Sequence, residues 1–411
     1  MVFTQKSSTV NKIALLESTQ LTTSSDNIDD YGACRRKLGI CYVGAIVLCA
    51  LVALMLEAPS VLFGHTDLSS ITWLRNLMLC TGAFELASLP FDLAGFRIER
   101  KFGRTAQSFM SYIQVWCEAA FKHGMLLLSS VFFFTFAAKI GGLAGVALSS
   151  LMVTIFFIWK QAEIARFLSN VHFEEPSNEM RGTYVQNRTG TVVLVMARSS
   201  DYGFTGGIVG LPRRESLVIP ANWLKEFSQQ ELWAEITRRN AAVESGSRTR
   251  GIVGAVLFVV CGVTIAAAMT IALYRLPLES SAGIVTTSLV FTLWSFLGLL
   301  LLPFLNQRGV IEADQLAVAK GVGRELFSQT IRKVDAKMEN ESTRSNAVQF
   351  VFHPIPTPGR RLSALDGPAA AGAWNIARYS IWLSLVGLGL LGRAVHCNAG
   401  RPDLWCMLPA D

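Results

Sequence analysis

Two stretches of this chain, Leu38–Leu56 and Gly251–Tyr274, are long, apolar and contain no charged residue. A helix needs about 20 such residues to cross the roughly 30 Å hydrocarbon core of a bilayer, and both stretches provide that length. Across the whole chain 51% of the residues are hydrophobic and only 16% are charged. The chain is therefore expected to be a mainly α-helical integral membrane protein with the lipid bilayer as a partner, and a soluble enzyme is excluded.

Further apolar stretches predict more crossings, although some of them carry charges. The third span along the chain, Phe109–Ala138, contains Glu118 and Lys122, which stand four residues apart on one helical face and can form an ion pair. Charges at membrane depth normally face protein or water, so these residues form either a structural pair or part of a polar chamber. The additional predicted spans are Ile71–Phe96, Phe109–Ala138, Gly141–Trp159, Ala282–Leu305 and Trp374–Leu391, which gives about seven transmembrane helices in a polytopic fold.

The distribution of basic residues predicts the orientation. Basic clusters precede the first span at 35–37 and follow the second at 97–104, whereas the loop 57–70 has neither Lys nor Arg. Because basic loops stay in the cytoplasm, the amino terminus and both large polar inserts are expected there. In a bacterium this membrane would be the inner, plasma membrane. The net charge of +7 is then explained by topology, and no nucleic-acid partner is expected.

The tail after the seventh span would lie outside the cell, because the number of crossings is odd. Cys397 and Cys406 belong to this tail and could form a disulfide bond there.

The spans divide the chain into segments. The expected segments are a disordered cytoplasmic tail (1–37), spans one to four (38–159), a first polar insert (160–250), spans five and six (251–305), a second polar insert (306–373), span seven (374–391) and an exported tail (392–411).

The two inserts are expected to form one small α+β domain. The first contains the strand-like runs Thr191–Met196 and Ser216–Pro220, with a glycine-rich turn between them, followed by the helix-like Glu231–Val243. This order predicts a small sheet beside a helix. An exposed edge strand could bind an extended peptide through backbone hydrogen bonds, or the strands could simply support the helix.

Four stretches in this order are similar to motifs of a known family. Leu89–Gly103 is similar to its Leu-Pro-Phe and Glu-x-Lys-x-Gly segment, and Phe204–Gly206, 217–220 and Glu231–Ala234 follow its strand, loop and active-site helix. Glu312–Ala317 is similar to its Glu-x-x-Ala-Asp-x-x-Ala helix, and His353-Pro354 with Arg361–Leu365 to its His-Pro and Arg-Ile-x-x-Leu segment. The chain thus resembles the type-one CAAX prenyl proteases, seven-span zinc metalloendopeptidases, and the resemblance implies a metalloprotease-like domain.

The resemblance also implies where zinc chemistry would lie. The family's first histidine, general base, second histidine and glutamate ligand fall on Arg238, Arg239, Ala242 and Val310. Arginine keeps its proton and alanine has no donor atom, so no zinc cofactor is expected. The family positions that this chain retains are Asp314, His353 and Arg361.

Other roles for these residues follow from their chemistry. Asp314, without a metal to orient, could pair with Arg238 in a bidentate contact, or the arginines could be solvated. His353 could bind a peptide carbonyl or could be an ordinary turn residue. Together with Phe204 and Gly206, His353 is a candidate for peptide binding.

The sequence therefore predicts a membrane-embedded pseudoprotease that binds or scaffolds a peptide or a membrane-protein client without cutting it. An active metalloendopeptidase with a non-standard site is the alternative, and its acid or base would be sought in Glu231, Glu235 or Glu244. A transporter or channel is a third class, suggested only by the charges in the second and third spans.

Overall fold

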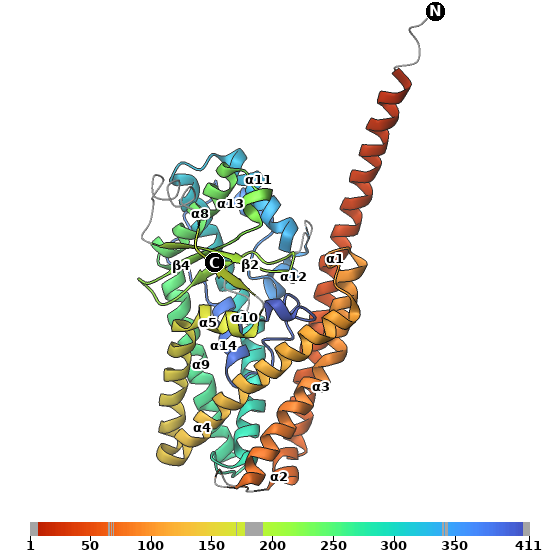
Figure 1. Ribbon diagram of the computed structural model, residues 1–411. Coiled ribbons are helices and arrows are strands. Elements are labelled where there is room, and N and C mark those ends of the chain that lie inside the picture. The colour runs from red at the N-terminus through yellow and green to blue at the C-terminus, as the bar shows by residue number, and fades with distance from the viewer. Residues whose placement is uncertain are drawn as a thin grey trace, which may run out of the picture.

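The fold was taken from a computed structural model, in which long helices stand below a smaller polar domain (Figure 1). The structure describes the backbone of residues 7–405 except 65, 67, 69, 170, 177–191, 339, 340, 342 and 343, and side chains from residue 31 onward except 385 and 386. The helices are α1 (Ser7–Met55), α2 (Ala58–Phe63), α3 (Ile71–Lys101), α4 (Phe109–Trp159), α5 (Gln161–Leu168), α7 (Trp223–Glu226), α8 (Gln229–Glu244), α9 (Ser247–Ala272), α10 (Ser281–Ala319), α11 (Arg324–Met338), α12 (Asn346–Phe352), α13 (Pro358–Ala364), α14 (Ala377–Val386) and the 3-10 helix η1 (Pro402–Leu404).

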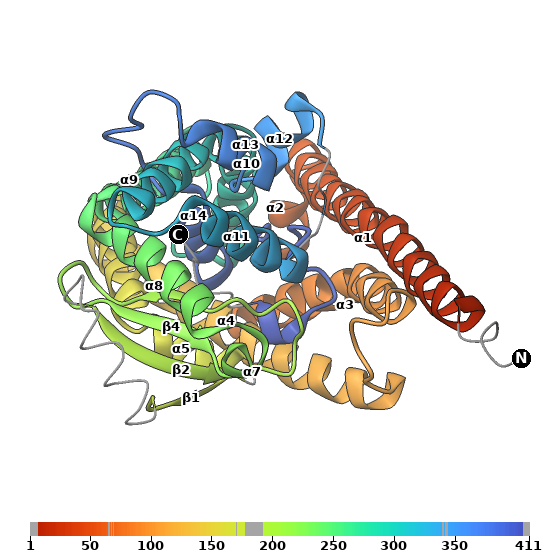
Figure 2. The same ribbon diagram turned by 90° about the horizontal axis from the view of Figure 1, so that it is seen from above.

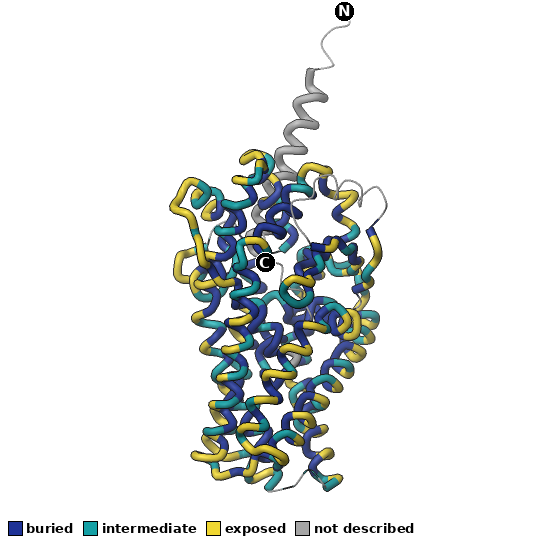
Figure 3. The backbone as a smooth tube through the Cα atoms, turned by 90° about the vertical axis from the view of Figure 1, so that its left-hand side faces the viewer, coloured by how far each residue is buried: buried dark blue, intermediate teal, exposed yellow. Residues whose placement is uncertain are grey.

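Among the described residues, five helices are long and apolar enough to cross a membrane: Tyr31–Met55 of α1, then α3, α4, α9 and α10. Serine side chains cap three of them, because Ser70, Ser108 and Ser280 each accept a hydrogen bond from a backbone N–H in the first turn. Large apolar residues such as Leu48 and Met55 are exposed, at 63% and 82%, and exposed and buried positions alternate along the long helices (Figure 3). Outward apolar side chains are what a lipid environment requires, so the protein is a multi-pass membrane protein in its architecture.

Helix α4 contains both the third and the fourth predicted spans. Gly142 has φ 54° and ψ −135° and divides α4 into two helical arms, and Figure 1 shows the chain turning back there. A Cβ at Gly145 would lie 2.1 Å from the carbonyl oxygen of Ala137, so the reversal needs glycine at that position as well. The charged pair predicted in the first arm is present, since Lys122 donates to Glu118.

The prediction of a seventh span over Trp374–Leu391 is wrong. Helix α14 has 10 residues, which corresponds to about 15 Å and is too short to cross a bilayer alone. Its neighbours Leu388 and Leu391 are 1% exposed, so this apolar stretch is buried in protein rather than lying in lipid. A buried core segment and a membrane span have the same composition, which explains the error.

The tail after α14 lies on the same side of the bundle as the polar domain. Arg401 forms an ion pair with Asp201 of the first insert, and the peptide N–H of Gly400 donates to Asp92 at 2.8 Å. Arg393 is 0% exposed and pairs with both Asp92, at 2.6 Å, and Glu85 on α3. The described part of the tail, up to residue 405, touches the domain, so the prediction that the tail and the domain lie on opposite sides of the membrane is wrong. Cys406 lies outside the described residues, and its disulfide with Cys397 stays a prediction.

Residues 31–37 of the predicted disordered tail are also helical. Tyr31 and Arg35 on α1 are each 1% exposed, and Tyr31 donates to the Glu99 carboxylate at 2.6 Å. Arg35 lies 3.7 Å from the same carboxylate. The glutamate at the end of α3 therefore fixes the start of the first span, and disorder up to residue 37 is wrong.

The polar domain contains one four-stranded sheet, with strand order β1-β2-β4-β3. Strands β2 and β4 are parallel, with Leu194 opposite Leu217, while β1 and β3 pair antiparallel at the two edges. The strands are β1 (His172–Glu174), β2 (Val193–Arg198), β3 (Gly207–Val209) and β4 (Ser216–Pro220). Helix α8 lies between this sheet and α11 when seen from above (Figure 2), which agrees with the expected small sheet beside a helix.

Candidate functional site

The motif resemblance places the protease active-site helix at α8, and the start of α8 is set by a capping box. The Ser228 hydroxyl accepts from the N–H of Glu231, and the Glu231 carboxylate accepts from the N–H of Ser228 at 2.7 Å. Glu231 also accepts from Lys333 of α11 at 3.0 Å. These hydrogen bonds, with the ion pair, keep the pKa of Glu231 below its usual value despite the opposing effect of partial burial.

Three charged side chains form a buried network along α8. Glu235 accepts from Nε of Arg238 at 2.8 Å, from Nη2 of Arg238 at 2.7 Å and from Nε of Arg239 at 2.7 Å. The exposed fractions of the three residues are 1%, 3% and 0%. Burial alone would raise the pKa of Glu235, but the two guanidinium charges outweigh it and lower the pKa to about 2. Glu235 is therefore ionised at neutral pH and holds both arginines.

Arg239 also ties α8 to the sheet. Its guanidinium donates to the carbonyl of Val218 on β4 at 3.0 Å and to the carbonyl of Thr205 at 2.6 Å. The same group lies over the ring of Trp223, 5.4 Å from the ring centre. The residue at the general-base position of the family thus acts as a structural donor between helix and sheet.

The zinc-ligand positions do not fit a zinc ion. Arg238 and Arg239 offer no lone pair, and their guanidinium groups already donate to Glu235. Ala242 belongs to an apolar cluster with Ala313 of α10, and Val310 is 0% exposed. Within the residues that the structure describes, no group of three or more His, Cys, Asp or Glu side chains could hold a metal. No step of chemistry can be assigned to zinc at this position.

The predicted pair between Arg238 and Asp314 is wrong. Asp314 on α10 accepts two hydrogen bonds from Arg361 of α13, from Nε and Nη2, each at 2.8 Å. Both partners are buried, at 0% and 5% exposure, and the planar fork of arginine matches the carboxylate. Arg238 donates instead to Glu235, which lies one helical turn earlier on the same helix. Two retained family positions, Asp314 and Arg361, are thus brought together to hold α13 against α10.

Phe204 and Gly206 lie in the turn that leads into β3. Phe204 is 3% exposed. Gly206 has φ +70°, and a Cβ there would lie 2.1 Å from the carbonyl oxygen of Val218, so no other residue fits this turn without a backbone shift. Both residues shape the sheet beside Arg239, and a direct role in peptide binding stays a prediction.

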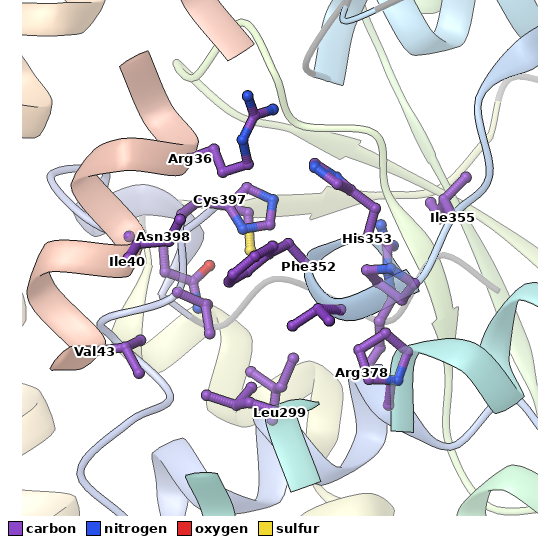
Figure 4. A pocket seen from close by; sticks show the side chains of 18 of the residues that line it. Arg36, Ile40, Val43, Leu299, Phe352, His353, Ile355, Arg378, Cys397 and Asn398 are labelled. Atoms are coloured by element: carbon purple, nitrogen blue, oxygen red, sulfur yellow. The ribbon is translucent and has the colours of Figure 1, made fainter. Parts of the chain in front are cut away.

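His353 ends α12 and lines a cavity of about 310 Å³ (Figure 4). Its ring lies 3.7 Å from the Glu341 carboxylate and 5.3 Å from the ring of His396. Glu341 also accepts from Arg36 of α1 and from Arg344. Sequence reasoning placed His353 near the cleft but missed His396 and Arg36, because it assigned the tail to the opposite side and used Arg36 only for topology.

The other acids considered for an alternative catalytic site are also engaged. Glu244 at the end of α8 accepts from Lys320, Glu231 forms the capping box, and Glu235 is paired with both arginines. None of these carboxylates lies in a ligand cluster within the part of the chain that the structure describes.

Comparisons with known proteins find a match in structure rather than in sequence. No protein-family model and no curated protein matches the chain. The crystal structure of S. mikatae Ste24p matches with a TM-score of 0.60 and 15% identity, covering 73% of this chain and 76% of that one. Ste24p is a type-one CAAX prenyl protease, the family that the motifs indicated. This chain therefore has a fold similar to that of Ste24p, with long apolar helices and a small α+β domain.

Proposed function

We propose that this protein is a pseudoprotease, which keeps the fold of the type-one CAAX prenyl proteases and binds a client without hydrolysing it. The observation that carries the proposal is the Glu235–Arg238–Arg239 network. Its guanidinium groups occupy two positions where the family needs a ligand and a base, and their positive charge would repel a divalent cation. Catalytic zinc needs about three protein ligands and an open site, which these residues do not provide.

The client is proposed to be a peptide or a membrane protein. An edge strand can pair with an extended chain, and β1 supports this, because it lies at one end of the sheet order with two of its three residues exposed, whereas β3 at the other end is buried. The cavity beside His353 is a second candidate contact. Phe204 and Gly206 would contribute by shaping the sheet rather than by touching the client.

The domain is proposed to face the cytoplasm. Arg97, Arg100 and Arg104 lie at the domain end of the helix bundle, and Arg104 donates to the carbonyl of Lys337 in α11. The basic end of α3 thus lies on the domain side, which is the cytoplasmic side under the positive-inside tendency. In a bacterium this membrane is the inner membrane.

The test is zinc content together with proteolysis, both measured on the purified full-length protein. We expect less than about one tenth of an equivalent of zinc by elemental analysis and no cleavage of a prenylated peptide, under conditions where Ste24p cleaves it. Equilibration with added zinc followed by desalting should not change either result. Stoichiometric zinc accompanied by peptide turnover would overturn the proposal and favour an active metalloendopeptidase.

A further inference from the structure

The cavity beside His353 has two chemically different ends (Figure 4). Leu299 of α10 and Val43 of α1 lie at the deep end, with Ile381 and Trp382 of α14 also in the apolar lining. At the other end lie Arg36 and His353. A cavity with an apolar body and a few polar groups gathered at one end is suited to an amphiphilic ligand.

The cavity is surrounded by more cationic groups than anionic ones. Arg36, Arg344 and Arg378 line it, and Asp335 is the carboxylate in the lining. A second carboxylate, Glu341 beside the cavity, is shared by Arg36 and Arg344. Three guanidinium groups thus stand against two carboxylates, and an anionic group would balance the remaining positive charge. Arginine is well suited to a carboxylate or a phosphate, because its planar fork can donate two parallel hydrogen bonds.

The apolar end lies at membrane depth and borders the lipid phase. Its residues on α1 and α10 belong to the candidate spans Tyr31–Met55 and Ser281–Ala319. Ile40 lines the cavity and is 44% exposed. A ligand from the bilayer can thus reach the cavity past the exposed side chain of Ile40.

We propose that this cavity binds a single-chain anionic amphiphile, with its acyl chain between α1, α10 and α14 and its carboxylate or phosphate head at Arg36 and Arg344. The volume of about 310 Å³ is at the lower end of the roughly 300–1,000 Å³ found for small-molecule sites, which suits one chain rather than two. Basic pockets between membrane helices bind lipid head groups by the same contacts. The inference holds whether or not the protein cuts peptides.

Photolabelling of the full-length protein in phosphatidylcholine vesicles tests the proposal. Three probes carry the same C16 chain with a terminal diazirine: the free fatty acid, its methyl ester and the lysophosphatidic acid. We expect at least one anionic probe to label peptides that contain Leu299 or Ile381 about tenfold more than the ester does, as expected for the loss of charge-assisted hydrogen bonds. Whichever anionic probe labels more strongly identifies the head group.

Two variants and one control make the result specific. Ile381→Trp fills the apolar end and should abolish cavity labelling, and Arg36→Gln should lower labelling by the anionic probes about tenfold while leaving the ester unchanged. Leu48→Trp on the outer face of α1, which is 63% exposed, should change nothing. Labelling by the ester as strong as that by both anionic probes, labelling confined to outer faces, or an unaffected Arg36→Gln variant would each overturn the proposal. If Ile381→Trp does not fold, the Arg36→Gln comparison decides alone.

Discussion

Replacing Arg239 by methionine removes the central contact between α8 and the sheet while keeping the volume of the side chain nearly constant. Arg239 is 0% exposed and donates to Glu235, Val218 and Thr205. The variant leaves two buried carbonyls without that donor and removes one of the two cations from a buried carboxylate. Breaking a buried ion pair by removing one partner costs about 3–5 kcal/mol.

The expected loss is a large fraction of a domain's stability, which is about 5–15 kcal/mol. For a domain of this size it corresponds to a fall in melting temperature of roughly 10 °C. Thermal unfolding of the purified protein in detergent, followed by tryptophan fluorescence at one scan rate, measures the change. Trp223 is a local reporter, because its ring lies 5.4 Å from the Arg239 guanidinium.

A matched control is Arg324→Met, since Arg324 pairs with Asp366 at the surface, where the side chains are 60% and 66% exposed. This variant should melt like the parent protein. A triple variant with apolar residues at Glu235, Arg238 and Arg239 should regain much of the lost stability, because no charge is left buried without a partner. An Arg239→Met variant that melts within about 1 °C of the parent protein would refute the reasoning.

Three further predictions concern the pH dependence of the Glu235 network and two other contacts. The pKa of Glu235 is lowered from 4.5 to about 2. The ionised Glu235 therefore stabilises the fold fully above pH 4.5, and this stabilisation is lost as the pH falls from there towards 2. Acid unfolding of Arg239→Met should begin at a higher pH than that of the parent protein. Gly95→Ala would put a Cβ 2.5 Å from a tail carbonyl and should expose the tail to limited proteolysis, whereas Gly82→Ala on the same helix, with nothing within 4 Å, should not. Arg361→Lys loses the bidentate contact with Asp314 and should lower the melting temperature by several degrees; a parental melting curve would contradict this.

The long apolar helices, and the order of strands and helix in the polar domain, could be predicted because their sequence signals are local. Gly251–Tyr274 contains no charge, and the structure has α9 there. The strand at Ser216–Pro220 matches β4, with four of its five residues buried. Length, composition and turn residues suffice for such elements.

The end of the chain could not be predicted, because its environment is set by distant residues. Arg393 is buried between Glu85 and Asp92, about 300 positions earlier in the sequence, and no local pattern indicates that pairing. The apolar segment before it has the composition of a span, but its side chains pack inside the protein. Burial against protein and burial in lipid select the same side chains, so hydropathy cannot separate them.

The arginine network, in contrast, had a local signal. Glu235 precedes Arg238 by three residues and Arg239 by four, which are the two spacings that place side chains together on a helix. A search for partners among family positions led to Asp314 instead. The spacing rule alone would have indicated the contacts that the structure has.

The same network sets the cost of introducing the zinc residues of the type-one CAAX prenyl proteases into this chain. Arg238→His, Arg239→Glu, Ala242→His and Val310→Glu would supply a ligand set, but they would leave Glu235 buried without its two cations and place a second carboxylate one turn away. Like charges in a buried site destabilise the fold. We therefore expect the fourfold variant to unfold more readily than the parent protein, and the addition of Glu235→Gln to recover part of the loss. A fourfold variant that melts at the parental temperature without zinc would show that Glu235 does not depend on the arginines.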